Sequence, residues 1–291
     1  MSAAPRRRTV ATDDGWRCPG AAMKALIAIC GVMLLTACST MIRTEAPATL
    51  FADADFGAAP PELSELDLFA LSPAMRDFLA HDVSRYVRSN GAPRGLYEAI
   101  RSSLRIDYDA AMTRTAAQTF DAKAGNCLSL VILTAALARS LHVDVRYRFV
   151  PRARTWTRTQ GMVWENGHVN IELSQRTNSI IAPALIVDFV PTEDLQSQLA
   201  QEIDERTVIA MYMNNRAAET LAAGDAGSAY WWARAALGMA PEYAPAYNTL
   251  GVIYLDREPQ LAERVFRFRL ADAPDDPMLL SNLVVALDRQ G

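Results

Sequence analysis

The stretch that decides the fold is Ala124–Val131, which reads AGNCLSLV. Asn126 is a good starting residue for a helix, because its side chain can accept a hydrogen bond from an unpaired N–H group of the first turn. The residues that follow have helical spacing, with leucines recurring three and four positions apart: Leu130, Leu133, Leu137 and Leu141. Valine, isoleucine and alanine fill the flanks, so we expect a buried helix that is apolar nearly all round.

Cys127 falls in the first turn of this predicted helix. The unpaired N–H groups and the helix dipole at that end favour a negative charge, and therefore favour a thiolate over a thiol. A cysteine in this position is a candidate nucleophile. The alternative is a buried structural cysteine, which is the commoner fate of a lone cysteine.

The first 37 residues have the features of an export signal. Residues 1–22 are rich in alanine and arginine, and Met23-Lys24 then precedes an apolar run over 25–37. A short positive region, an apolar core of about a dozen residues and small residues at the end are typical of a secretory signal. The run is too short to span a bilayer, which takes about 20 apolar residues. We therefore expect 1–37 to be a signal segment, with Met23 as the natural start.

The end of this segment, Leu35-Thr36-Ala37-Cys38, resembles the bacterial lipobox. The resemblance implies that Cys38 is acylated, with palmitate or a similar chain, and becomes the first residue of a lipoprotein of the cell envelope. By the same resemblance, Ser39 permits transfer to the outer membrane, where the protein would face the periplasm. The alternative is an ordinary cleaved signal.

Processing at Cys38 changes both the thiol count and the charge of the chain. Cys18 and Cys30 leave with the signal, so Cys127 is the one free thiol expected in an oxidising compartment, where an unpaired thiol is a liability unless it is buried or used. The whole chain has a formal charge of −4, and residues 1–37 contribute +3 from five basic and two acidic side chains, which leaves −7. This acidic balance gives no support for nucleic-acid binding.

The segments on either side of the cysteine helix differ in the spacing of their apolar residues. Residues 62–103 are predicted to be helical, with a start at Ser72-Pro73 and a stop at Asn90-Gly91. After the cysteine helix, 143–149 alternates apolar and polar residues, as a strand with one buried face does. We expect a loop over the arginine- and threonine-rich residues 151–160. His142 lies about 22 Å along the helix from the cysteine and therefore cannot act as its base.

Two further strands are predicted over 161–173 and 184–190, and each carries one chemically informative residue. His168 shares a strand face with Asn170, and Asp188 lies within an apolar run. A desolvated carboxylate left unpaired would cost several kcal/mol, so Asp188 needs a partner. His168 is the histidine that can supply it, while Arg146 or Arg148 is the alternative.

Cys127, His168 and Asp188 together form a candidate catalytic triad. A thiolate attacks a carbonyl group, an imidazole removes and returns the proton, and a carboxylate fixes the imidazole tautomer. The backbone N–H of Cys127 can stabilise an oxyanion. Candidates for a second oxyanion donor are Gln118, Asn126 and Trp164.

Three pieces of the sequence, taken in order, resemble the transglutaminase-like superfamily, which has a papain-like core. They are Gly125-Asn126-Cys127-Leu128-Ser129, Gly167-His168-Val169-Asn170 and Val187-Asp188-Phe189-Val190-Pro191. The resemblance covers about residues 70–195 and implies a Cys-His-Asp triad and acyl transfer at amide bonds. The superfamily includes peptidases, deamidases, crosslinking enzymes and inactive members. No Ca²⁺-binding loop signature is visible.

The C-terminal third has the pattern of a tetratricopeptide repeat over residues 205–291. The later key positions of one repeat and most positions of the next are filled by Gly224, Ala229, Ala236, Pro241, Tyr247, Leu250, Gly251, Tyr254, Ala262, Phe266 and Pro274. Such repeats usually make a surface that binds a peptide or protein. The alternative is a generic helical bundle.

The predicted fold is α+β, with a cysteine-bearing helix packed on an antiparallel sheet and followed by all-α repeats. The predicted divisions are a signal segment (1–37), a lipidated tether (38–61), a transglutaminase-like domain (62–200) and a tetratricopeptide-repeat region (201–291). The predicted function is that of a lipid-anchored cysteine peptidase, amidase or acyltransferase acting on a protein or peptide, with no cofactor or metal. The alternative is a non-catalytic assembly factor that binds its partner through the repeats.

Overall fold

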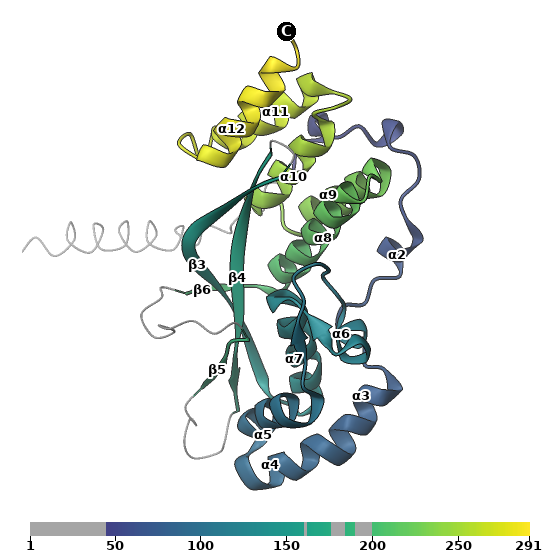
Figure 1. The fold of residues 1–291 in the computed structure, drawn as a ribbon, viewed down its shortest axis with the longest axis vertical. Helices are drawn as coiled ribbons and strands as arrows, with labels where there is room; N and C mark the ends of the chain where they lie inside the picture. Colours follow the sequence, from purple (N-terminus) through teal and green to yellow (C-terminus); the bar gives the residue numbers. More distant parts are fainter. Residues whose placement is uncertain (1–44, 160–161, 176–183, 190–199) are drawn as a thin grey trace, which may run out of the picture. The chain divides into compact units, whose positions relative to one another are not determined.

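A computed structural model describes residues 45–159, 162–175, 184–189 and 200–291, and for 151–159 and 162–167 it describes the backbone alone (Figure 1). The helices before the sheet are η1 (Ala48–Leu50), η2 (Asp53–Asp55), α2 (Pro61–Ser64), α3 (Pro73–Phe78), η3 (Leu79–Val83), α4 (Ser84–Asn90), α5 (Ala92–Ala99), η4 (Ile100–Leu104), α6 (Ala116–Ala122) and α7 (Cys127–Ser140). The strands are β1 (Asp107–Tyr108), β2 (Ala124–Gly125), β3 (Asp144–Thr159), β4 (Met162–Ser174), β5 (Leu185–Val187) and β6 (Gln201–Ile203). The C-terminal helices are α8 (Glu205–Ala222), α9 (Ala226–Met239), α10 (Ala244–Tyr254), α11 (Pro259–Leu270) and α12 (Pro277–Asp288).

The helical hairpin that precedes the cysteine helix begins and turns where the sequence predicts. Ser72 caps α3 by accepting a hydrogen bond from the backbone N–H of Met75 at 3.2 Å. A π-helical segment, η3, carries the helix on into α4, which ends at Gly91 with a φ of 76°. A methyl group on Gly95 would lie 2.6 Å from the backbone of Val87, so the crossing of α4 and α5 requires a glycine there.

Helix α7 is the centre of the mixed helix-and-sheet domain. Every residue from Leu128 to Ala138 is buried, as its apolar sequence predicts. The helix packs against strands β3 and β4 and against helices α5 and α6 (Figure 1). Cys127 therefore begins the most enclosed helix of this domain.

The sheet has the order β5-β4-β3-β6, and all its described pairs are antiparallel. The loop prediction for 151–160 is wrong: β3 continues to Thr159 and pairs with β4 there, after a register shift between Val150 and Thr155. Backbone pairing between the two strands, rather than an apolar face, defines this part of the hairpin. Asp188 follows the end of β5, which the sequence predicted to extend to residue 190.

The C-terminal region is helical from Glu205 onward, in agreement with its predicted spacing. Consecutive helices pack against one another from α8 to α12. Gly251 lets α10 approach α11 closely, because a methyl group there would lie 2.4 Å from the ring of Phe266. The identity of these helices as tetratricopeptide repeats stays a prediction.

Residues 45–57, which the sequence places in an unpatterned tether, pack on the C-terminal helices instead. The ring of Phe56 stacks on Tyr230 with centroids 4.2 Å apart, and the hydroxyl of Tyr254 donates to the carbonyl oxygen of Leu50 at 3.0 Å. Leu50 and Phe56 are both buried. The described part of the segment is therefore held in place by aromatic packing that its sequence did not reveal. Among the described residues, no helix has the length and apolar character needed to cross a bilayer.

Candidate active site

Cys127 lies at the first position of α7, in the first turn as predicted. Asn126 is the N-cap, and its side-chain oxygen accepts from the backbone N–H of Ser129 at 2.9 Å. The cysteine is half-buried and is a free thiol. This residue therefore lies at the positive end of the helix dipole and is not fully buried.

His168 and Asp188 form a buried pair beside this helix. The Nε2–H group of His168 donates to both carboxylate oxygens of Asp188, at 2.8 and 2.7 Å. The two side chains are 5% and 1% exposed, so the pair is shielded from water and from salt. The predicted partnership of these residues is present in the structure.

The sheet register explains how the pair is formed. Ile171 on β4 lies opposite Val187 on β5, so the residue after Val187 lies beside Asn170. The Nδ2 group of Asn170 donates to Asp188 Oδ2 at 3.2 Å. Asn170 is thus a second donor to the carboxylate, and the alternation of strand side chains places it on the same face as His168.

The environment of His168 favours its charged form. Burial alone lowers its pKa, but the hydrogen bonds with Asp188 and Cys127, together with the negative charges of both, raise the pKa of His168 from 6.5 to about 9. Nε2 of the ring bonds to Asp188, and Cys127 is near enough to act on the pKa of the same ring. The structure therefore brings all three residues of the predicted triad together.

The alternative partners and histidines are placed elsewhere. Arg146 bonds to Glu172 at 3.4 Å in an exposed pair. Ile186, in the apolar run that contains Asp188, is 43% exposed, so this run is only partly buried. His142 is exposed and follows the far end of α7, with a φ of 53°, in agreement with its exclusion as the base.

Two of the three candidate oxyanion donors take part in helix caps. The Nδ2 group of Asn126 donates to Thr113 Oγ1 at 2.8 Å. Gln118 belongs to a capping box at the start of α6, where its Oε1 accepts from the N–H of Thr115 at 3.0 Å. The Trp164 side chain lies outside the described residues. The backbone N–H of Cys127 lies at the start of α7, where the sequence predicts an oxyanion donor.

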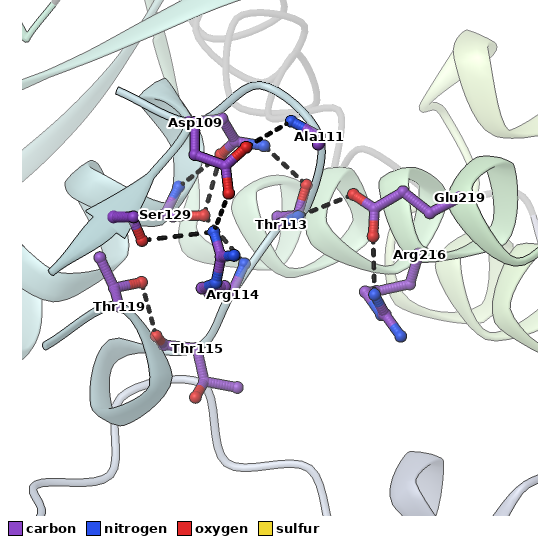
Figure 2. Close-up of polar contacts among 11 residues, drawn as sticks. Asp109, Ala111, Thr113, Arg114, Thr115, Thr119, Ser129, Arg216 and Glu219 are labelled. Carbon is purple, nitrogen blue, oxygen red and sulfur yellow. Dashed lines mark hydrogen bonds and ion pairs between the residues drawn. The ribbon is translucent and has the colours of Figure 1, made fainter. Parts of the chain in front are cut away.

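A polar network supports the turn before Cys127 (Figure 2). The hydroxyl of Ser129 donates to Asn126 Oδ1 at 2.9 Å and accepts from the backbone N–H of Arg114 at 2.9 Å. The guanidinium of Arg114 pairs with Asp109 at 2.7 Å. The sequence did not predict these contacts, because they join the cap to an irregular segment with no pattern of its own.

A cavity of about 320 Å³ opens beside the acid end of the triad. Its walls include Asp188, Phe189, Tyr97, Arg101 and Arg105. It meets the triad at Asp188, so it does not by itself place a substrate on the sulfur. Among the described residues, no group of three or more His, Cys, Asp or Glu side chains is arranged to hold a metal ion.

Comparison with known proteins gives one match. Residues 80–176 match the Transglutaminase-like superfamily, so the chain carries a transglutaminase-like domain over about one third of its length. The matched range contains Cys127 and His168 and ends before Asp188. No curated protein and no solved structure matches the chain significantly.

Proposed function

We propose that this protein is a cysteine-dependent acyl-transfer enzyme, with Cys127 as the nucleophile, His168 as the base and Asp188 as the orienting acid. The transglutaminase-like domain supports cysteine chemistry, and one geometric observation carries the rest. That observation is the buried imidazole of His168, held by Asp188 on one nitrogen and interacting with Cys127. The proposed substrate is an amide bond in a protein or peptide.

The geometry supports a reaction in two halves. In the first, the Cys127 thiolate, stabilised by the His168 imidazolium, attacks the carbonyl carbon and forms the C–S bond. The developing oxyanion is stabilised by the N–H of Cys127 at the helix start. The C–N bond then breaks, and the leaving amine takes a proton from His168.

In the second half, a nucleophile releases the acyl group from the sulfur. Water or an amine gives its proton to the neutral His168 ring and attacks the thioester carbon, and the Cys127 thiolate leaves. Water makes the reaction a hydrolysis, and an amine makes it a transfer. Asp188 holds the ring orientation in both halves and steadies its positive charge.

The proposal extends to membrane attachment and to partner binding. Acylation at Cys38 would anchor the protein in the bacterial cell envelope, at the outer membrane facing the periplasm. The helices α8–α12 would bind a protein or peptide, as tetratricopeptide repeats do. A Cys38→Ser variant should leave the membrane fraction for the soluble one, whereas an ordinary cleaved signal predicts no change in fractionation.

A peptide chloromethyl ketone, which carries an electrophile in place of the amide, tests the catalytic part. Labelling is quantified by mass spectrometry on the peptide that contains Cys127. We expect rapid labelling of the wild type, none at this position in Cys127→Ala, and slow labelling in His168→Gln. His142→Gln is the matched control, because that ring is exposed at the other end of α7.

The proposal fails if folded wild-type protein is labelled no faster than His168→Gln. A folded protein with an unreactive Cys127 that still retains a specific partner would support the non-catalytic assembly factor instead.

A further inference from the structure

Helix α8 contacts Thr113, a residue of the irregular segment 109–115 (Figure 2). Glu219 on α8 accepts a hydrogen bond from the backbone N–H of Thr113 at 2.7 Å through its Oε1. Its other oxygen accepts from Arg216 at 2.7 Å. Both carboxylate oxygens are therefore engaged, one with its own helix and one with a residue 106 positions away.

Thr113 links this contact to the helix cap. Its hydroxyl accepts from the side chain of Asn126 at 2.8 Å and from Asn215 on α8 at 3.1 Å. Asn126 is the residue immediately before Cys127 and caps α7. Thr113 is 2% exposed, so water does not compete for these bonds.

The segment that holds Thr113 depends on these contacts for its position. Residues 109–115 contain no helix and no strand. At its start, the backbone N–H of Asp109 donates to the carbonyl oxygen of Gly125 at 3.0 Å. Further along, backbone N–H groups are held by side chains from two other parts of the chain, Ser129 on α7 and Glu219 on α8. Thr113 therefore lies between α8 and Asn126, with a hydrogen bond to each.

We propose that Glu219 and Asn215 are positioning residues for Cys127, through Thr113 and Asn126. The C-terminal helices thus contribute to the reactivity of the sulfur as well as to partner binding. This inference rests on the proposed function of Cys127. A displacement of about 1 Å at a reacting atom can lower a rate on the order of 100-fold, so a loosened cap has a measurable effect.

The test compares Glu219→Ala, Glu219→Gln and Glu205→Ala in the full chain. Glu205 is the matched control: it lies on the same helix and bonds to Arg139 and Tyr147, away from the turn before Cys127. The first readout is the rate of chloromethyl ketone labelling at Cys127 per folded molecule. The second is amide hydrogen exchange in the first turn of α7, which needs no catalysis.

We expect Glu219→Ala to label at least about 10-fold more slowly and to exchange faster in the first turn of α7. Glu219→Gln should keep both readouts closer to the wild type than Glu219→Ala does, because its amide oxygen can still accept from Thr113 although the ion pair with Arg216 is lost. Glu205→Ala should change neither, even if it lowers the melting temperature by the same amount. Should Glu219→Ala fail to fold, Asn215→Ala, which removes only one bond, should move both readouts in the same direction.

Equal labelling and equal exchange in Glu219→Ala and Glu205→Ala would overturn the inference. A failure of the proposed function gives a different result, because the wild type is then labelled at Cys127 as slowly as His168→Gln. Amide hydrogen exchange in the first turn of α7 still shows whether contacts from α8 hold that turn in place.

Discussion

Replacing Asp188 with asparagine is expected to remove the positive charge from His168 at neutral pH. The substitution keeps the size of the side chain and an oxygen that can accept from Nε2. It removes the negative charge and the charge-assisted character of the hydrogen bond. Because the pair is almost fully buried, water does not replace what is lost.

The expected magnitude follows from the surroundings of the ring. Burial lowers the pKa of His168, and the Asp188 hydrogen bond is the largest interaction that raises it, to about 9. Without the carboxylate, burial dominates, and we expect a pKa near or below the ordinary 6.5. Such a fall in the pKa corresponds to roughly 3 kcal/mol. Cys127→Ala should lower the pKa of His168 by less, because its interactions with the ring are weaker than those of Asp188.

The assay is an NMR titration of the imidazole signals. The chain has three histidines, and the other two, His81 and His142, are exposed, so their replacement by glutamine assigns the spectrum without disturbing the core. The reasoning is refuted if His168 titrates at or below 6.5 in the wild type. It is also refuted if its midpoint is the same in Asp188→Asn.

Three further predictions concern stability, each measured by urea unfolding. Since the pKa of His168 is higher in the folded chain than in the unfolded one, its contribution to stability is complete below pH 6.5 and is lost as the pH rises to about 9. We expect the free energy of unfolding to fall by about 3 kcal/mol over that range in the wild type, and an equal fall in His168→Gln would contradict this. Asn126→Ala removes the cap of α7 and should lower the free energy of unfolding by about 1–2 kcal/mol. An unchanged urea midpoint would show that the cap does not stabilise the fold. Gly251→Ala forces a methyl group against the ring of Phe266 and should lower the free energy of unfolding by about 1–3 kcal/mol. Gly238 has open space around it, so Gly238→Ala should instead raise the free energy of unfolding by up to about 1 kcal/mol. Equal effects of the two substitutions on the free energy of unfolding would refute this packing argument.

The central helix and the pairing of His168 with Asp188 could be predicted from the sequence, because the local pattern and the tertiary structure agree at both. The cap at Asn126 and the apolar run after it specify a buried helix by themselves. A carboxylate in an apolar run requires a partner, and His168 was the histidine on a neighbouring strand. The structure places that pair as this reasoning requires.

The second half of β3 could not be predicted in the same way. Residues 151–159 have no apolar alternation, and their strand geometry comes from pairing with β4. Backbone hydrogen bonding to a partner strand leaves no pattern in the hydropathy of a sequence. Helix α6 was also missed, although Thr115 and Gln118 have the spacing of a capping box and carried a usable signal.

The contacts that support the turn before Cys127 could not be predicted from the sequence, for a different reason. Thr113 and Glu219 are far apart in the chain, and neither belongs to a recognisable motif. The aromatic packing of Phe56 on Tyr230 is equally remote in sequence. Contacts of this kind depend on tertiary structure, so a reading of local periodicity does not detect them.

The central claim is that Cys127 accepts an acyl group and that His168 helps to release it. The most direct measurement is the reaction of the protein with p-nitrophenyl acetate, followed by mass spectrometry of the Cys127 peptide. We predict an acetyl thioester on Cys127 whose hydrolysis is slowed on the order of 100-fold or more in His168→Gln. A wild-type protein that gains no acetyl group at Cys127, or whose thioester decays at the same rate with and without the imidazole, would contradict the account.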